Sequence, residues 1–179
     1  MRYLALLRGI NVGRHKRVAM PALRELLGSL GHTDVATYLQ SGNALFTSPR
    51  DDPAGLAREI ERRIARDLGL EVAVMLRTGE ELARVVAGNP FPSATLDPAR
   101  LHVSFLSGTP ELERLAAIDR RQYEPDRFEV GDRVIYLWYP NGLQETKLTD
   151  GFWRSLDLGV QATARNWNTV TKLLSLAND

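Results

Sequence analysis

Glycines and cations are concentrated in one short segment near the start of the sequence, and this combination suits anion binding. Residues 9–17 contain Gly9 and Gly13 together with three cations, and Arg8 stands immediately before them. Glycine leaves backbone N–H groups accessible, while arginine and lysine donate charged hydrogen bonds to phosphate or carboxylate oxygens. A helix beginning near Pro21 would add its positive end. We predict that this segment, called the basic loop, binds a small phosphate- or carboxylate-bearing molecule. The alternative is a solvated loop whose glycines only form turns.

Spacing excludes two phosphate-binding motifs and one kind of nucleophile. The basic loop lacks the G-x-G-x-x-G pattern, and Lys16 is not preceded by glycine as a P-loop lysine is. Ser41 lies in the segment Gln40-Ser41-Gly42-Asn43, which does not have the G-x-S-x-G sequence of a nucleophile elbow. This segment is expected to join two strands, whereas the elbow joins a strand to a helix. The side-chain amides of Gln40 and Asn43 and the Ser41 hydroxyl remain candidates for hydrogen bonds to a ligand.

A polar helix start near the end of the chain supplies the remaining candidates. Trp167 keeps the helical spacing of a buried face, and Asn166 fits the N-cap position. Packing and capping can account for this segment, and the alternative is a site to which Arg165 and Asn168 contribute. The predicted ligand-binding residues are Arg8, Asn11, Gly13, Arg14, Lys16, Arg17, Gln40, Ser41, Asn43, Arg165 and Asn168. No catalytic residue is assigned, and whether the protein is an enzyme is left open.

Cysteine and histidine usage removes several classes of site. The 179 residues include no cysteine, which excludes a disulfide scaffold, a thiolate metal site and a cysteine nucleophile. The three histidines, His15, His32 and His102, do not have metal-ligand spacing. We therefore predict neither a metal nor a cofactor.

The charge is balanced overall but uneven along the chain. The 23 Lys and Arg residues against 22 Asp and Glu give a net charge of +1, which argues against a general nucleic-acid coat. Six cations nevertheless precede the first acid, Glu25. No apolar run approaches the ~20 residues that cross a bilayer, and the first one is too short for a signal peptide. We expect a cytoplasmic protein with no membrane partner.

Hydrophobic periodicity predicts an α+β fold whose first half has the ferredoxin-like order βαββαβ. The expected elements are strands at 3–7, 35–39, 44–47 and 70–76, and helices at 21–30 and 53–68. In this order the loop after the first strand and the turn between the second and third strands lie at the same end of the sheet. The basic loop should therefore lie beside residues 40–43.

The second half is expected to be a smaller β-α-β-β-α-α arrangement packed with the first half. The predicted organisation is a ferredoxin-like subdomain (1–77), a helix and proline-rich linker (78–98), and a second α+β subdomain (99–179). The segment from Tyr3 to Gly9 is similar to that from His102 to Gly108, which suggests an internal duplication.

Three segments in order resemble one bacterial family of unknown function, DUF1697. They are Arg8-Gly9-Ile10-Asn11-Val12-Gly13, Tyr38-Leu39-Gln40-Ser41-Gly42-Asn43, and Thr163-Ala164-Arg165-Asn166-Trp167-Asn168-Thr169-Val170-Thr171-Lys172-Leu173. The sequence departs from the family at Arg14, where relatives often have a second glycine. The resemblance implies a cytosolic α+β protein with a ferredoxin-like portion, and it implies no activity.

Two other functions follow from other residues. Single-stranded RNA binding is one alternative, because RNA-recognition modules share the βαββαβ order and stack bases on aromatic side chains of the central strands. Tyr3 and Phe46 occupy those strands here, although the module's sequence signature is absent. A protein-interaction module is the other, with Tyr136, Trp138 and Tyr139 as its anchors.

Overall fold

The computed structural model describes residues 1–93 and 95–179, and the chain divides into two compact units. Unit 1 comprises Met1–Arg84 and Lys172–Asp179, and unit 2 comprises Val85–Thr171. The sequence-based subdomains 1–77 and 99–179 differ from this division, because the last eight residues pack with unit 1. One residue of the expected linker 78–98, residue 94, lies outside the described residues.

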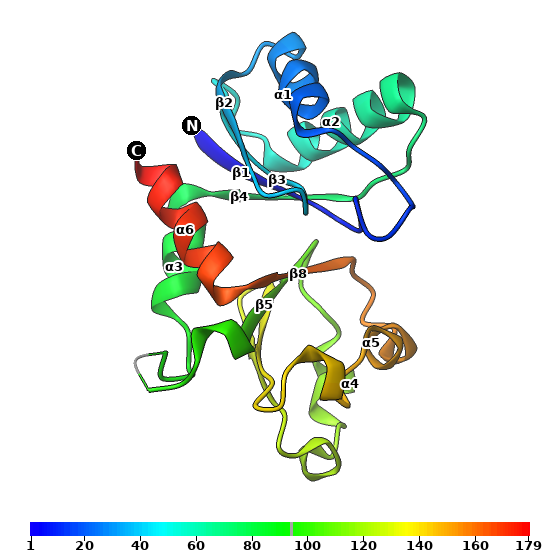
Figure 1. The fold of residues 1–179 in the computed structure, drawn as a ribbon, viewed down its shortest axis with the longest axis vertical. Coiled ribbons are helices and arrows are strands. Elements are labelled where there is room, and N and C mark those ends of the chain that lie inside the picture. The colour runs from blue at the N-terminus through cyan, green and yellow to red at the C-terminus, as the bar shows by residue number, and fades with distance from the viewer. Residues whose placement is uncertain (94) are drawn as a thin grey trace. The chain divides into compact units, whose positions relative to one another are not determined.

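Unit 1 has the predicted βαββαβ order. Its elements are β1 (Arg2–Leu7), α1 (Met20–Ser29), β2 (Thr33–Tyr38), β3 (Asn43–Thr47), α2 (Pro53–Leu68) and β4 (Val74–Thr78), followed by the start of α3 (Gly79–Ala87). The strands form one antiparallel sheet in the order β2-β3-β1-β4. Figure 1 shows α1 and α2 over one face of this sheet. The predicted class, mixed α+β with a ferredoxin-like N-terminal half, is confirmed.

Alternating residues of the strands build the core of unit 1 under α1 and α2. Tyr3 of β1 stacks on Phe46 of β3, with 5.6 Å between ring centroids, and both side chains are fully buried. From the helices, Leu23, Leu27, Ile60 and Ile64 complete this apolar cluster. The opposite face of the same strands is also apolar and buried, with Leu4 and Leu6 exposed by 1% or less.

Local signals in the sequence account for where the helices begin. The Asp52 side chain accepts a hydrogen bond from the backbone N–H of Gly55 at 2.9 Å, and Pro53 occupies the first turn of α2. At α3 the Thr78 hydroxyl accepts from the Glu81 N–H, while the Glu81 carboxylate accepts from the Thr78 N–H. This reciprocal pair is a capping box.

Unit 2 repeats the topology of unit 1. Its elements are η1 (Pro98–Arg100), β5 (Leu101–Leu106), α4 (Leu112–Ala116), η2 (Arg120–Tyr123), β6 (Arg127–Gly131), β7 (Val134–Trp138), η3 (Leu143–Glu145), α5 (Asp150–Leu156) and β8 (Ala162–Asn166), and α6 (Trp167–Asn178) starts in unit 2 and ends in unit 1. The antiparallel sheet has the order β6-β7-β5-β8, which matches β2-β3-β1-β4 strand for strand.

Strand β8 is missing from the predicted β-α-β-β-α-α order, so that order is corrected to βαββαβα. The strand escapes detection because its buried positions are not apolar. Its two buried side chains are those of Thr163 and Arg165. A half-buried strand is recognised by alternating apolar residues, and here the alternation is between small and polar ones.

The strand register makes the correspondence between the units residue-specific. Leu4 of β1 pairs with Arg77 of β4, and Val103 of β5 pairs with Arg165 of β8. Tyr3 therefore corresponds to His102, which is the alignment that the sequence similarity suggests. Both equivalent arginines are buried, Arg77 at 2% exposed and Arg165 at 7%.

One connection differs sharply in length between the two units. The chain from β1 to α1 runs over residues 8–19, whereas the equivalent chain from β5 to α4 runs over residues 107–111. The same topology therefore forms in unit 2 with a connection less than half as long as that in unit 1. The basic loop lies within the longer connection, which is the blue segment between β1 and α1 in Figure 1.

Candidate functional site

The basic loop lies beside the turn between β2 and β3, as the topology predicts. The Asn11 Nδ2 donates a hydrogen bond to the Gln40 carbonyl at 2.6 Å, and the Leu7 N–H donates to the Gly42 carbonyl at 2.9 Å. The chain that leads into β4 joins the same end of the sheet, because the Lys16 Nζ donates to the Glu71 carbonyl at 2.7 Å. Three loops that are distant in sequence are therefore tied together in unit 1.

Asn11 fastens these segments together through its side chain. Besides its bond to Gln40, its Nδ2 donates to the Val18 carbonyl at 2.9 Å, and its Oδ1 accepts from the Val18 N–H at 2.9 Å. Its backbone N–H also donates to the Lys16 carbonyl. Asn11 has a φ of +56°, a left-handed conformation that asparagine tolerates better than most residues. This residue closes the loop on itself and holds it against the turn.

Gly42 allows the turn to approach the loop closely. Its φ is +90°, and a Cβ built there would lie 2.8 Å from the Ile10 Cδ1 and 2.9 Å from the Leu7 Cβ. By contrast, a Cβ at Gly9 or Gly13 would have no atom within 4 Å. The turn thus presses against Leu7 and Ile10, while there is open space around Gly9 and Gly13.

The cations of the loop are exposed and lack protein counter-charges. Arg14, Lys16 and Arg17 are all exposed. Within the described residues, no carboxylate lies within 4.0 Å of their charged nitrogens. At the tip, the backbone N–H groups of Gly13 and Arg14 also donate to no acceptor in the described part of the chain. Two successive N–H groups beside uncompensated cations can receive an oxyanion.

The predicted turn residues have different surroundings. Gln40 and Ser41 are exposed, so their side chains can reach a ligand beside the loop. Asn43 is fully buried, and its Nδ2 donates to the Tyr38 carbonyl at 2.8 Å and to the Ser41 Oγ at 3.1 Å. Its carboxamide therefore stabilises the turn from within.

Arg165 and Asn168 belong to unit 2, so their assignment to the loop site stays a prediction. The Arg165 guanidinium donates to the Thr163 Oγ1 at 2.8 Å and to the Ala164 carbonyl at 2.9 Å. Burial lowers the pKa of Arg165 to about 10, which leaves it protonated at neutral pH. Asn168 is exposed, and its N–H donates to the Asn166 Oδ1, the cap that the sequence predicts.

Sequence reasoning missed two apolar side chains at the same end of unit 1. Val12 is 67% exposed and Leu39 is 51% exposed. They adjoin the residues of the Asn11–Gln40 hydrogen bond. Leu39 has a φ of +59°, although the sequence places it in a regular strand. Exposure of this kind leaves no hydrophobic pattern, because each residue sits singly among polar neighbours.

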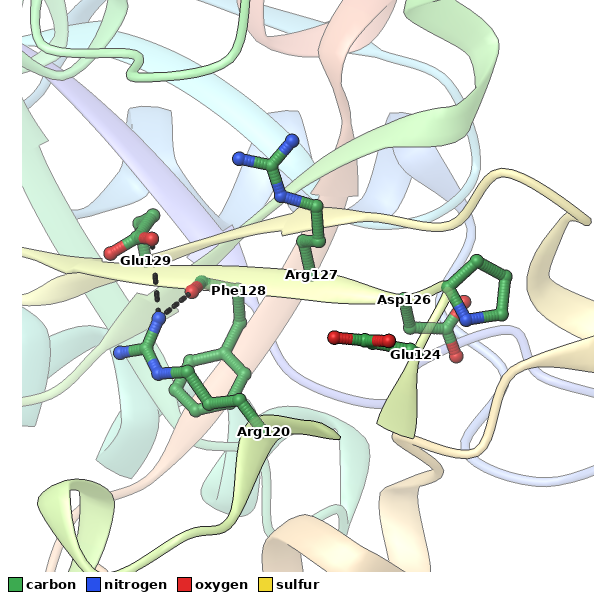
Figure 2. A pocket seen from close by; sticks show the side chains of 7 residues that line it. Arg120, Glu124, Asp126, Arg127, Phe128 and Glu129 are labelled. Atoms are coloured by element: carbon green, nitrogen blue, oxygen red, sulfur yellow. Dashed lines mark hydrogen bonds and ion pairs between the residues drawn. The ribbon is translucent and has the colours of Figure 1, made fainter. Parts of the chain in front are cut away.

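A hollow of about 590 Å³ lies elsewhere, along the edge strand β6 in unit 2. Its charges are largely satisfied by the protein itself. Figure 2 shows Arg120 crossing the Phe128 ring, 4.2 Å from its centroid, and bonded to the Glu129 carboxylate and the Phe128 carbonyl. The buried Asp126 accepts from the Thr146 hydroxyl and the Lys147 N–H. None of the predicted ligand-binding residues lines this hollow.

The described residues include neither a metal-binding cluster nor a membrane-spanning helix. No group of three or more His, Cys, Asp or Glu side chains there could hold a metal ion. Among the helices that the structure describes, none has both the length and the apolar character to cross a membrane.

Four of the five side chains expected to serve the two alternative functions are buried, and the fifth, Trp138, is partly exposed. Tyr3 and Phe46 face the helices and are fully buried, so they cannot stack on RNA bases. Tyr136 and Tyr139 are 5% and 4% exposed, and the Tyr136 hydroxyl donates to the Val85 carbonyl at 2.7 Å. Neither tyrosine can anchor a partner, because anchors must be accessible.

The fold and the loop end of unit 1 together define a mixed α+β protein in which one βαββαβ topology occurs twice. The chain belongs to the DUF1697 family, described as a protein family of unknown function, whose sequence model matches residues 1–136. Strand β8 and helix α6 lie beyond the matched region.

A solved structure with a similar fold is that of the conserved bacterial protein SP0830 from Streptococcus pneumoniae. It has a TM-score of 0.78 and 24% sequence identity, over 99% of this chain and 98% of that one. At this identity the likeness shows the fold alone. Comparison with curated proteins gives no match.

Proposed function

We propose that this protein binds a phosphate- or carboxylate-bearing ligand at the basic loop, residues 9–17. The observation that carries the proposal is the group of three exposed cations, Arg14, Lys16 and Arg17, with no carboxylate near them in the described residues. Elsewhere the described arginines often pair with acids, for example Arg50 with Glu59 and Arg114 with Glu111.

Preorganisation supports the same conclusion. A flexible basic loop would lose conformational entropy when it closed on an anion, and that loss weakens binding. Here the Asn11 side chain makes three hydrogen bonds, and Lys16 is tied through its Nζ to the Glu71 carbonyl. The loop is therefore held in one shape before a ligand arrives.

Unit 2 provides an internal comparison. The equivalent connection, residues 107–111, contains no arginine or lysine, and its Glu111 accepts from Arg114. Because the same topology forms there with a short connection that has no cation, the βαββαβ topology itself does not require a long basic loop. The length and the cations of the loop in unit 1 therefore support a role in binding. We assign no reaction to the site.

The proposal is tested by titrating the protein with inorganic phosphate and with citrate while the backbone amide signals are followed by NMR. The amide signals of Gly13 and Arg14 should shift saturably, because these N–H groups face the anion. Arg14→Ala should weaken binding by about two- to fivefold, the range for an exposed ion pair.

Arg58→Ala is the matched control, because Arg58 is an exposed arginine on α2 in the same unit. It should leave the affinity unchanged. Equal losses for the two variants, or shifts spread over the whole of unit 1 rather than centred on the loop, would refute the proposal.

A further inference from the structure

One exposed apolar side chain, Val12, lies in the basic loop, and another, Leu39, lies at the neighbouring turn; together they indicate which class of anionic ligand fits. Single exposed apolar residues are common and need no explanation. Val12 and Leu39 are different because they lie at the same end of unit 1, next to the hydrogen-bonded pair Asn11 and Gln40. They are two of the five large apolar side chains that are strongly exposed in the described chain.

The backbone at Leu39 is strained in a way that packing does not explain. A φ of +59° places a leucine in the left-handed region, at a cost of roughly 1–2 kcal/mol for a residue with a Cβ. Glycine or asparagine would be accommodated there more easily. About half of the residue is nevertheless exposed, so burial of the side chain offsets only part of the strain. Strain of this kind in a native structure points to a function for the side chain.

The shape of this end favours a surface over a groove-binding peptide. Val12 projects 67% exposed from the tip, and there is open space around both Gly9 and Gly13. An exposed apolar residue in a loop that carries three exposed cations matches the boundary of a bilayer, where acyl chains lie beneath anionic headgroups. A peptide would instead require a recess to receive its side chains.

We propose that the ligand of the basic loop is the headgroup layer of an anionic membrane, with Val12 and Leu39 inserted among the lipid chains. This inference rests on the proposed anion site and specifies its ligand. Peripheral contact of this kind needs no spanning helix. Each cation near the surface contributes about fivefold in affinity, and the two side chains add an apolar term.

The test is sedimentation of the whole protein with vesicles of phosphatidylcholine alone and of phosphatidylcholine with about one-third phosphatidylserine. Binding should appear only with the anionic vesicles and should be released by high salt. Leu39→Asn should lower the partition coefficient by about tenfold, because the apolar side chain is lost. Asparagine suits a positive φ, so this variant should fold at least as stably as the natural chain.

Leu143→Asn is the matched control, since Leu143 is 58% exposed in unit 2. It should bind anionic vesicles as the natural protein does. Equal binding to both kinds of vesicle, or equal losses for Leu39→Asn and Leu143→Asn, would overturn the inference. Tighter capture by an acidic polyglutamate peptide than by vesicles would also overturn it, in favour of a protein partner.

Phosphate titration separates this inference from the proposed function. If inorganic phosphate shifts the Gly13 and Arg14 amides but anionic vesicles do not sediment the protein, the anion site stands and the membrane inference fails. If phosphate, citrate and anionic vesicles all fail to bind, both fail. If vesicles bind and the Arg14→Ala variant binds them about fivefold less tightly, both are supported.

Discussion

Gly42 is the position at which the structure makes its sharpest prediction. A methyl group there would lie 2.8 Å from the Ile10 Cδ1 and 2.9 Å from the Leu7 Cβ. The Ile10 side chain can rotate, but the Leu7 Cβ is fixed by β1. Overpacking of a tight core destabilises the folded state by about 1–3 kcal/mol, and alanine at a φ of +90° adds roughly 1–2 kcal/mol of backbone strain. Alanine also reduces the conformational entropy of the unfolded chain, which offsets about 0.4–1 kcal/mol of this loss. Gly42→Ala should therefore lower the free energy of unfolding by about 2–4 kcal/mol.

Substitutions at two other glycines separate the effect of overpacking from that of backbone strain. Gly13 has a φ of +60° with open space around it, so Gly13→Ala carries the strain alone and should lose about 1 kcal/mol. Gly28 lies in α1 without a positive φ and without a close neighbour. Gly28→Ala should gain about 0.5–1 kcal/mol, because alanine is the better helix former. The difference between Gly42→Ala and Gly13→Ala measures the close approach of turn and loop.

The assay is urea unfolding followed by far-ultraviolet circular dichroism, supported by hydrogen exchange at the amides of β1 and β3. All three tryptophans, at 138, 153 and 167, lie in unit 2, so tryptophan fluorescence reports on that unit separately. With a urea dependence of about 2 kcal/mol/M, the dichroism midpoint of Gly42→Ala should fall by about 1–2 M. If Gly42→Ala loses no more than Gly13→Ala, the turn does not press on the loop and the described site geometry is refuted.

Three further substitutions or conditions test other parts of the structure. The Asp side chain of Asn11→Asp cannot donate to the two carbonyls that the carboxamide binds. The variant's free energy of unfolding in urea should fall by about 2–3 kcal/mol, and its loop amide signals should move. Unchanged stability would contradict the fastening role. Burial lowers the pKa of His32 and of His102 from 6.5, so folding favours the neutral rings. Stability should be full above the unfolded pKa and decline as pH falls below it, and glutamine at both positions should reduce that decline; a midpoint that rises on acidification would contradict this. Tyr136→Phe removes the buried bond to the Val85 carbonyl and should lower the tryptophan-detected stability by about 1–2 kcal/mol, whereas no change would show that water replaces it.

The sequence predicts most of unit 1 because its local signals agree with one another. Asp52 and Pro53 mark the start of α2, Gly69 ends it in a left-handed conformation, and the Thr78–Glu81 pair begins α3. Each signal acts over a few residues, so it can be read without knowing the fold. The order of the strands alone predicts that the basic loop lies beside the turn between β2 and β3.

What the sequence does not predict depends on distant contacts or on weak patterns. Strand β8 is invisible because its buried residues are Thr163 and Arg165. The hydrogen bonds that the Asn11 amide donates to Val18 and Gln40 are not predicted either, because no local pattern reveals a partner 29 residues away. Leu39 is expected in a strand that ends one residue earlier, because its φ cannot be read from its residue type.

The discontinuity of unit 1 has a consequence for how the chain is made. Its first segment, Met1–Arg84, leaves the ribosome before any of unit 2, whereas Lys172–Asp179 follows all of it. At ~5–20 residues per second, synthesis of the intervening segment delays the completion of unit 1 by on the order of ten seconds. All of unit 2 is synthesised before unit 1 is complete, although its synthesis begins later. During that interval the nascent unit 1 lacks the end of α6, and a chaperone or the ribosome surface has its best opportunity to hold it.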